Sequence, residues 1–507
     1  MSLTVTESAK ATRRDWIGLA VIALPCLFYS MDFTILHLAV PQIASALKPS
    51  SAELLWIVDI YGFMIAGALI TMGTLGDRVG RRRLLMIGAA AFGVTSALAA
   101  FSPTSEVLIA ARALQGLAAA TLAPSTLSLI RNMFHDDHER AFAIGVWVAA
   151  FSVGAAIGPV VGGAILAHYW WGAAFLINVP TMLLLLVLGP RFLPEFRDEN
   201  AGRIDLVSAA QSMAAVLAII YGIKHAAEAG WTPLSLFAIG VGLLIGAYFF
   251  QRQASLADPL IDVGLFRVRG FSAALATNIV ALFVIFGTFL FIAQYLQLVL
   301  GMGPFEAGLW TAPSGLIFAL GSVAAPALVR RYPAHIVIAV GFLISAVGFA
   351  MLTVLSATDG PWLMFAGMMI LCLGVAPCGA ITTDLVMASA PPERAGAASG
   401  ISETSFEFGG ALGIAVLGSL VTAIYRSAMV GEALPGVPAD AVMAAKDTLG
   451  GAVDIAKHLS AEAGANLLHA SRAAFVHAFE VSSAVSAAGS VAAAAFAYMW
   501  LKSERRR

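Results

Sequence analysis

The sequence predicts an all-α polytopic protein that crosses a membrane many times. Hydrophobic residues make up 60% of its 507 residues, charged residues only 12%, and the mean hydropathy is +0.87. Soluble globular domains carry about 25% charged residues, so composition alone excludes that class. The three cysteines, Cys26, Cys372 and Cys378, lie in apolar runs without metal-ligand spacing. We therefore expect buried thiols and no metal site.

Apolar runs of membrane-spanning length recur along the whole chain. About 20 apolar residues cross the hydrocarbon core as a helix, and windows of that size give fourteen segments. The expected spans lie near residues 16–38, 54–75, 84–102, 106–130, 141–167, 172–190, 204–223, 234–251, 271–298, 306–329, 335–356, 363–389, 398–424 and 473–500.

The basic residues give these spans an orientation. With the N-terminus in the cytoplasm, 22 of the 29 lysines and arginines fall on the cytoplasmic side, which is the bias that the positive-inside rule describes. Both chain ends are then cytoplasmic. Arg112 alone lies within a span, and the outer segments are expected to hold Lys48, Lys224, Arg426, Lys446, Lys457 and Arg472.

One long connection, residues 425–472, interrupts the pattern on the outer side. Its sequence has helix-like periodicity with mixed charge. We expect an external pair of short amphipathic helices that caps the C-terminal half. A flexible loop without function is equally consistent with the sequence.

Five acidic residues fall within the expected spans: Asp32, Asp59, Asp384, Glu403 and Glu407. Near the centre of a membrane helix, each costs roughly 2.5–3.5 kcal/mol on an insertion scale. Glu407 lies close to mid-depth, where desolvation favours its protonated form, whereas a lipophilic cation beside it favours the ionised form. Proton and cation then compete for one position, which is sufficient for exchange transport.

The same residues also admit structural explanations. Asp59 is shallow enough to face a wet vestibule, and Glu403 is close enough to a helix N-terminus to be stabilised by the helix dipole. Asp384 lies near a membrane face and close to Arg394, where a structural role is as consistent as a functional one. Arg112 needs a carboxylate or carbonyl partner and is also consistent with a pin between helices.

The loop after the second span is rich in glycine and arginine. Its sequence is GTLGDRVGRRRLL, in which the glycines permit tight turns and the aspartate can cap a helix or pair with an arginine. From these properties alone it is a basic anchor on the cytoplasmic side. The residues concerned are Gly73, Gly76, Asp77, Arg78, Gly80 and Arg81.

The fifth span carries a second glycine-rich stretch, GAAIGPVVGG. Gly154, Gly158 and Gly162 are spaced by four residues, with Gly163 beside them, and form a smooth ridge that lets another helix approach closely. Pro159 removes one backbone hydrogen bond and kinks the helix.

These stretches resemble signature motifs of the major facilitator superfamily. The loop is similar to G-x-L-x-D-R-x-G-R-R, RALQGLAAA is similar to R-x-x-x-G with Arg112 as its arginine, and GAAIGPVVGG is similar to the antiporter motif G-x-x-x-G-P-x-x-G-G of exporters. Together with MDFTILHLAVP, LLWIVDIYGFMIAG, WWGAAFLINVP and GISETSFEFGGALGIAVLG, they make nearly the whole chain resemble the fourteen-span drug:proton antiporters. The likeness is closest to bacterial quaternary-ammonium and methyl-viologen exporters.

The resemblance implies a fold and residue roles. It implies two six-helix bundles, residues 1–202 and 253–507, linked by two additional helices in residues 203–252, with the binding cavity between the bundles. It also implies that the arginine-rich loop gates the cytoplasmic side, that Arg112 assists proton transfer, and that the protein is a monomer in the bacterial cytoplasmic membrane. The chain departs from the family where His37 replaces a usual Asn. It also departs in LVRRYPAHIV, the second-half counterpart of the loop, which lacks the Asp and Gly.

The expected function is proton-driven export of hydrophobic cations, namely quaternary ammonium biocides, viologens and cationic dyes. The expected proton-coupling and cation-binding residues are Asp32, Asp59, Glu403, Glu407 and Arg112, with Asp384 as an additional acidic candidate. The proton gradient is the expected energy source, because the sequence contains no G-x-x-x-x-G-K nucleotide-binding loop. No cofactor or nucleic-acid partner is expected. Aromatic rings near the carboxylates can offer π-faces to a quaternary cation: Trp56, Tyr61, Trp147, Phe175 and Phe406.

Other functions are also consistent with a polytopic membrane protein. Export of an endogenous lipid or siderophore, with incidental drug efflux, is the alternative within transport, although acidic residues at cavity depth favour cations. A membrane sensor usually carries a soluble output domain, and an intramembrane enzyme needs a nucleophile–His–acid or metal constellation. The sequence shows neither feature.

Overall fold

The computed structural model describes residues 10–197, 205–256, 259–356, 360–389, 395–430 and 434–502. Within these ranges, fourteen helices are long and apolar enough to cross a membrane, which confirms the expected all-α fold and number of spans. Large apolar side chains on these helices are exposed, for example Val94 at 61%, Leu244 at 72% and Val323 at 79%. Such an apolar exterior is suited to lipid rather than water.

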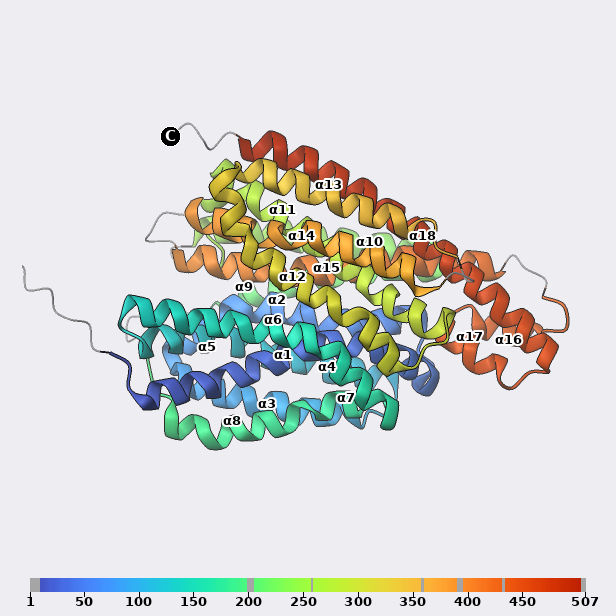
Figure 1. Cartoon of the computed structure of the whole chain (residues 1–507), viewed down its shortest axis with the longest axis horizontal. Coiled ribbons are helices and arrows are strands. Elements are labelled where there is room, and N and C mark those ends of the chain that lie inside the picture. The colour runs from blue at the N-terminus through green and yellow to red at the C-terminus, as the bar shows by residue number, and fades with distance from the viewer. Residues whose placement is uncertain are drawn as a thin grey trace, which may run out of the picture.

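The first eight helices form one group, drawn from blue to green in Figure 1. A capping box starts α1, where Thr12 accepts from the backbone of Asp15, and a second box at Ser50 and Glu53 starts α2. The fourth and sixth spans each consist of two successive helices. The bounds are α1 Arg13–Leu47, α2 Ser51–Val79, α3 Arg81–Ala100, α4 Ser105–Ala119, α5 Leu122–Met133, α6 Asp137–His168, α7 Ala173–Leu176 and α8 Asn178–Phe192.

The helices from α11 onward form a second group, drawn from yellow-green to red in Figure 1. The division of the chain into two bundles with bounds at 202/203 and 252/253 stays a prediction. The first of these bounds lies outside the described residues, and the second falls within α10 (Pro233–Ser255). The bounds are α11 Arg269–Gln294, α12 Pro304–Arg331, α13 Ala334–Leu352, α14 Pro361–Ser389, α15 Ala395–Val430, α16 Ala439–Ala445, α17 Leu449–Ala456 and α18 Ala461–Trp500, with the short turns η1 Leu265–Arg267 and η2 Tyr295–Val299.

The two additional helices are α9 (Leu206–Ala229) and α10 (Pro233–Ser255). α9 packs against α10 and also against α2 of the first group and α15 of the second. A small buried cluster of Phe63, Ile220, Ala411 and Ala415 fills the place where α2, α9 and α15 meet. α9 therefore contacts both groups of helices.

The two ends of the molecule differ. α1 begins and α18 ends at one end, which we call the terminal face, whereas α16 and α17 lie at the other end, which we call the hairpin face (Figure 1). These two short helices confirm the structure expected for the long connection. The connection is shorter than predicted, however, because α15 runs to Val430 and α18 begins at Ala461. Polar residues extend both helices beyond the apolar windows from which the spans were predicted.

The pair of short helices α16 and α17, which we call the hairpin, contacts the first group of helices as well as the C-terminal half that it was expected to cap. Ser45 of α1 donates a hydrogen bond to Asp454 Oδ1 at 3.2 Å, and Lys48 Nζ lies 3.6 Å from Asp454 Oδ2. A Cβ on Gly450 would lie 2.7 Å from the Ala44 Cβ, so a side chain there would prevent this approach of α17 to α1. The hairpin thus ties the two groups together at this face.

Candidate functional site

Asp32 and Arg112 form an ion pair inside the first group of helices. Arg112 Nη1 lies 2.8 Å from Asp32 Oδ2, with side chains only 1% and 2% exposed. Asn178 donates to Asp32 Oδ1 at 2.7 Å, and Arg112 also donates to Gln115 Oε1 at 2.9 Å and to the Ile57 carbonyl at 3.3 Å. These hydrogen bonds satisfy both charges away from water. The expectation that Arg112 needs a carboxylate partner is confirmed.

Two of the expected aromatic residues lie beside this arginine. The Arg112 guanidinium carbon is 4.2 Å from the ring centroid of Tyr61 and 5.6 Å from that of Phe175. Both distances fall in the range of cation–π attraction. In this conformation, these two π-faces interact with a cation that belongs to the protein itself.

Asp59 pairs with Lys224, which corrects the expected position of that lysine. The basic-residue pattern predicts Lys224 in an outer segment, but it lies within α9, a candidate membrane span. Its Nζ is 2.7 Å from Asp59 Oδ1, and both side chains are at most 1% exposed. The ammonium group also lies 3.6 Å from the centroid of the Trp56 ring. A hydropathy window ends at a charged residue, so it could not detect a buried lysine whose partner comes from α2.

Glu403 and Glu407 lie one turn apart on α15, which packs against α2 of the first group. Glu407 is about 18 Å along α15 from its start, at 1.5 Å per residue. Tyr29 of α1 donates a hydrogen bond to Glu407 Oε1 at 2.8 Å, so this carboxyl joins the two groups. Both carboxyls are half-buried. Among the described residues, neither has a basic side chain within ion-pair distance.

The acidic residues therefore fall into distinct kinds. Asp32 and Asp59 are buried and neutralised by a basic partner, whereas Glu403 and Glu407 are half-buried and lack one within the described ranges. Asp384 is exposed on α14, and Arg394, the neighbour suggested for it, lies outside the described residues. The structure places Glu403 and Glu407 one turn apart on α15, whereas Asp384 differs from both in being exposed.

Rings around Tyr29 add an aromatic wall beside Glu407. The centroid of Tyr29 lies 5.6 Å from that of Phe151, which lies 4.7 Å from that of Trp147. Phe406, on the same helix as Glu407, is 41% exposed and packs edge-on against Phe286 at 6.1 Å. Tyr29 and Phe151 were not among the aromatic residues expected from the sequence. A polar tyrosine three residues before Asp32 in an apolar span was the available signal for Tyr29.

The arginine-rich loop is a compact joint between α2 and α3. Gly80 adopts a φ of 114°, and its N–H donates to the Gly76 carbonyl at 2.9 Å. Asp77 Oδ1 lies 2.5 Å from Arg81 Nη2, and the backbone N–H of Arg82 donates to Glu195 Oε1 at 3.1 Å. The loop is thus held to the segment that follows α8. Arg78 is exposed, and Gly73 faces Pro124 with room for a Cβ at 3.8 Å.

The glycine ridge of α6 allows close packing on two sides. A Cβ on Gly154 would overlap the Leu27 carbonyl of α1, and one on Gly162 would lie 2.7 Å from Ile35. Gly158 faces Thr34 of α1 in the same way. On another side, a Cβ on Gly163 would lie 2.5 Å from the Pro304 carbonyl oxygen of α12, and the Pro159 carbonyl meets Gly308 of the same helix. The expected close packing is confirmed, and part of it joins the two groups.

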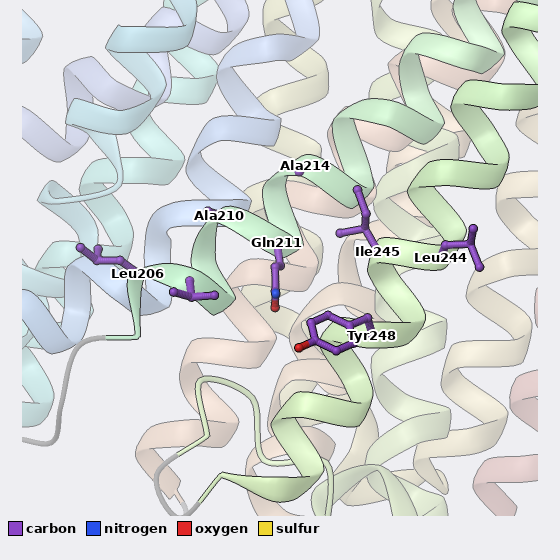
Figure 2. Close-up of a pocket in the computed structure, with 8 residues that line it drawn as sticks. Leu206, Ala210, Gln211, Ala214, Leu244, Ile245 and Tyr248 are labelled. Carbon is purple, nitrogen blue, oxygen red and sulfur yellow. The ribbon is translucent and has the colours of Figure 1, made fainter.

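The structure also contains a groove of about 710 Å³ between α9 and α10. Figure 2 shows Gln211 and Tyr248 as the polar side chains among its labelled residues. None of the expected site residues lines it. Separately, the described residues contain no cluster of three or more His, Cys, Asp or Glu that could hold a metal ion. The acidic pair on α15 therefore remains the candidate site.

Comparisons with known proteins agree with this architecture. A family model described as Major Facilitator Superfamily matches residues 22–414. The chain is 42% identical over 498 residues to the multidrug efflux pump LfrA of Mycolicibacterium smegmatis, covering 98% of each protein. It is 36% identical to the methyl viologen resistance protein SmvA of Salmonella typhimurium, covering 97% of this chain and 100% of that protein.

A solved structure has the same fold at low sequence identity. It is a bacterial homologue of the human lysosomal transporter Spinster, in an inward-facing and unoccupied conformation. The TM-score is 0.70 at 18% identity, and the match covers 97% of this chain and 98% of that one.

Proposed function

Because the chain belongs to the Major Facilitator Superfamily and is a multi-pass membrane transporter rather than an enzyme, we propose that it is a proton-driven antiporter that exports hydrophobic cations. Quaternary ammonium compounds, viologens and cationic dyes are the proposed substrates. The multidrug and methyl viologen relatives support this class. The proton gradient is the proposed energy source.

The observation that carries the proposal is the pair Glu403 and Glu407. Each buried carboxylate of the first group is in direct contact with a basic side chain, whereas neither Glu403 nor Glu407 has such a contact among the described residues. Arg131 of α5 is near enough to attract Glu403 electrostatically, without forming an ion pair. A half-desolvated carboxyl without a directly paired counter-ion is stable when it binds either a proton or an external cation. Two such groups one turn apart can hold up to two positive charges, from protons or from substrate.

The aromatic residues beside Glu407 suit the apolar part of such a substrate. Tyr29, Phe151 and Trp147 form a continuous set of rings on the α1 and α6 side, and a quaternary cation is attracted to π-faces without needing a hydrogen-bond donor. A substrate that contacts Glu407 Oε1 competes with the Tyr29 hydroxyl, which donates a hydrogen bond to that oxygen. Binding is thereby linked to a contact between the two groups of helices.

The proposed cycle is alternating access around this pair. In the described conformation the hairpin face is closed, since Gln297 of η2 donates to the Leu38 carbonyl at 3.0 Å and α17 packs on α1. We assign the terminal face to the cytoplasm because it carries most of the arginines. The cation then enters from the cytoplasm, the halves rock about the site, and a proton from outside replaces it.

The test uses inside-out vesicles that contain the protein and have an acidic lumen, followed with a pH-sensitive dye. A quaternary ammonium cation should collapse the gradient with the wild type but not with Glu407→Gln. Glu306→Gln is the matched control, because Glu306 is an exposed carboxyl in the first turn of α12. It should behave like the wild type.

Two outcomes contradict parts of the proposal. If Glu407→Gln collapses the gradient as fast as the wild type, coupling does not pass through Glu407. If the wild type responds to no cation in a panel of quaternary ammonium compounds, viologens and dyes, export of cations is wrong. In that case export of an endogenous lipid or siderophore becomes the better explanation.

A further inference from the structure

Lys224 is a buried lysine in a helix that is long and apolar enough to cross a membrane. It lies in α9, one of the two additional helices, and its side chain is only 1% exposed. A lysine inside a membrane helix is costly, and it is tolerated when a specific partner holds it. The surroundings of its ammonium group therefore indicate what the α2 and α9 interface is built to bind.

These surroundings have the chemistry of a cation-binding site. The ammonium nitrogen lies 2.7 Å from Asp59 Oδ1 and 3.6 Å from the centroid of the Trp56 ring. Trp56 and Asp59 are three residues apart on α2, so they lie on one face of that helix. A carboxylate beside an aromatic face is the combination that attracts alkylammonium and quaternary ammonium groups.

The carboxylate has further binding capacity. Asp59 Oδ2 is buried and has no hydrogen-bond partner among the described residues. Buried polar atoms are almost always satisfied, so an unsatisfied oxygen next to an occupied one points to a missing donor or cation. Lys224 therefore neutralises the Asp59 carboxylate but donates a hydrogen bond only to Oδ1 and leaves Oδ2 without a donor.

Helix α9 makes ionic contacts with both groups of helices. Glu228, one turn after Lys224 on α9, lies 3.9 Å from Arg426 Nη1 of α15. Arg426 also pairs with Asp447 at 2.5 Å. α9 thus has one ionic contact with each group of helices, Lys224 with α2 and Glu228 with α15. When the two groups move relative to each other, α9 cannot keep both contacts unchanged.

We propose that Lys224 is a tethered cation that occupies a second cation-binding position, formed by Trp56 and Asp59, and that it must withdraw before a substrate alkylammonium group binds there. This position is separate from the Glu403 and Glu407 pair. The inference rests on the proposed function in one respect, namely that the substrates are organic cations. Lys224 then determines specificity, because its presence withholds a third carboxylate from the substrate.

The test counts bound cations by equilibrium dialysis of purified full-length protein with benzyltrimethylammonium, a water-soluble quaternary ammonium probe. At a probe concentration just sufficient to fill the α15 pair, the wild type should bind one equivalent, because Lys224 still occupies Asp59. Lys224→Met, which removes the tethered charge and keeps the chain length, should bind two. Lys457→Met is the matched control because Lys457 is 64% exposed, and it should bind one.

Two further variants locate the additional equivalent. Asp59→Asn/Lys224→Met removes both charges, so it should fold without an unpaired buried ion and bind one equivalent only. Glu407→Gln/Lys224→Met should retain one equivalent although Glu407→Gln alone binds none. This last comparison separates the two proposals, because it reports on the Trp56 and Asp59 position whether or not Glu407 couples to protons. A single equivalent in folded Lys224→Met overturns the inference.

A measurement on the wild type covers the case in which Lys224→Met fails to fold. Reductive methylation of lysines, followed by mass spectrometry, reports how accessible each ammonium group is. Saturating benzyltrimethylammonium should raise the methylation rate of Lys224 severalfold relative to that of Lys457. An unchanged ratio means that Lys224 stays on Asp59 while the cation is bound, and that result also overturns the inference.

Discussion

Replacement of Gly154 by alanine tests whether the ridge of α6 is set by steric contact with α1. The new Cβ would overlap the Leu27 carbonyl oxygen and lie 3.0 Å from the Leu27 carbonyl carbon. These are backbone atoms, which cannot rotate away as a side chain can. The helices α1 and α6 must therefore separate locally for the variant to fold.

The size of the effect follows from a comparison within the same helix. Gly145 also lies in α6, and a Cβ there would meet no atom within 4 Å. Alanine is favoured over glycine in a helix by roughly 0.5–1 kcal/mol, and this gain applies to both variants. It cancels in their difference, which leaves the overpacking cost of about 1–3 kcal/mol. The rigid backbone at Leu27 places our expectation in the upper half of that range.

The assay is reversible unfolding in mixed micelles of a mild detergent and sodium dodecyl sulfate. Gly145→Ala should be slightly more stable than the wild type, and Gly154→Ala should be less stable. Equal free energies of unfolding for the two variants would refute the steric argument, because the helix-propensity gain is the same in both.

Two further predictions use the same unfolding assay. Asp32→Asn leaves Arg112 charged and buried without its carboxylate, so it should lower the free energy of unfolding by about 3–5 kcal/mol. Asp32→Asn/Arg112→Met should recover most of that loss. A double variant as unstable as the single one would contradict the ion-pair explanation. Gly80→Ala should be destabilised by about 1–2 kcal/mol because its φ of 114° is unfavourable for a residue with a side chain. Adding Glu195→Ala, which removes the carboxyl 2.5 Å from the new Cβ, should relieve only part of this cost, and complete relief would show that the backbone conformation is not the cause.

Much of the fold was predictable because the membrane imposes a simple rule on sequence. Every span must hydrogen-bond its backbone groups within a helix and present an apolar exterior to lipid. A window of apolar residues was therefore enough to find all fourteen spans. The two short helices of the hairpin were also predictable from their periodicity. The ends of α15 and α18 were not, because a helix that continues into water needs no apolar window.

The candidate site was predictable in its residue types but not in its pairings. A buried arginine requires a polar partner, but the positions of the acidic residues in the sequence do not indicate that Arg112 pairs with Asp32 on α1. Lys224 was misplaced for the same reason, since its partner Asp59 is 165 residues away in sequence. Pairing depends on how helices pack, and that information is not local. It is also what distinguishes Glu403 and Glu407 from the other carboxylates.

The most direct test of the central claim is to measure protons released when a cation binds. Purified protein in weakly buffered detergent solution is mixed with tetraphenylphosphonium, and the pH change is recorded with an indicator dye. If proton and cation compete at the α15 pair, the wild type should release protons on binding, and Glu407→Gln should release fewer or none. Binding of the cation by the wild type without any proton release would contradict the account.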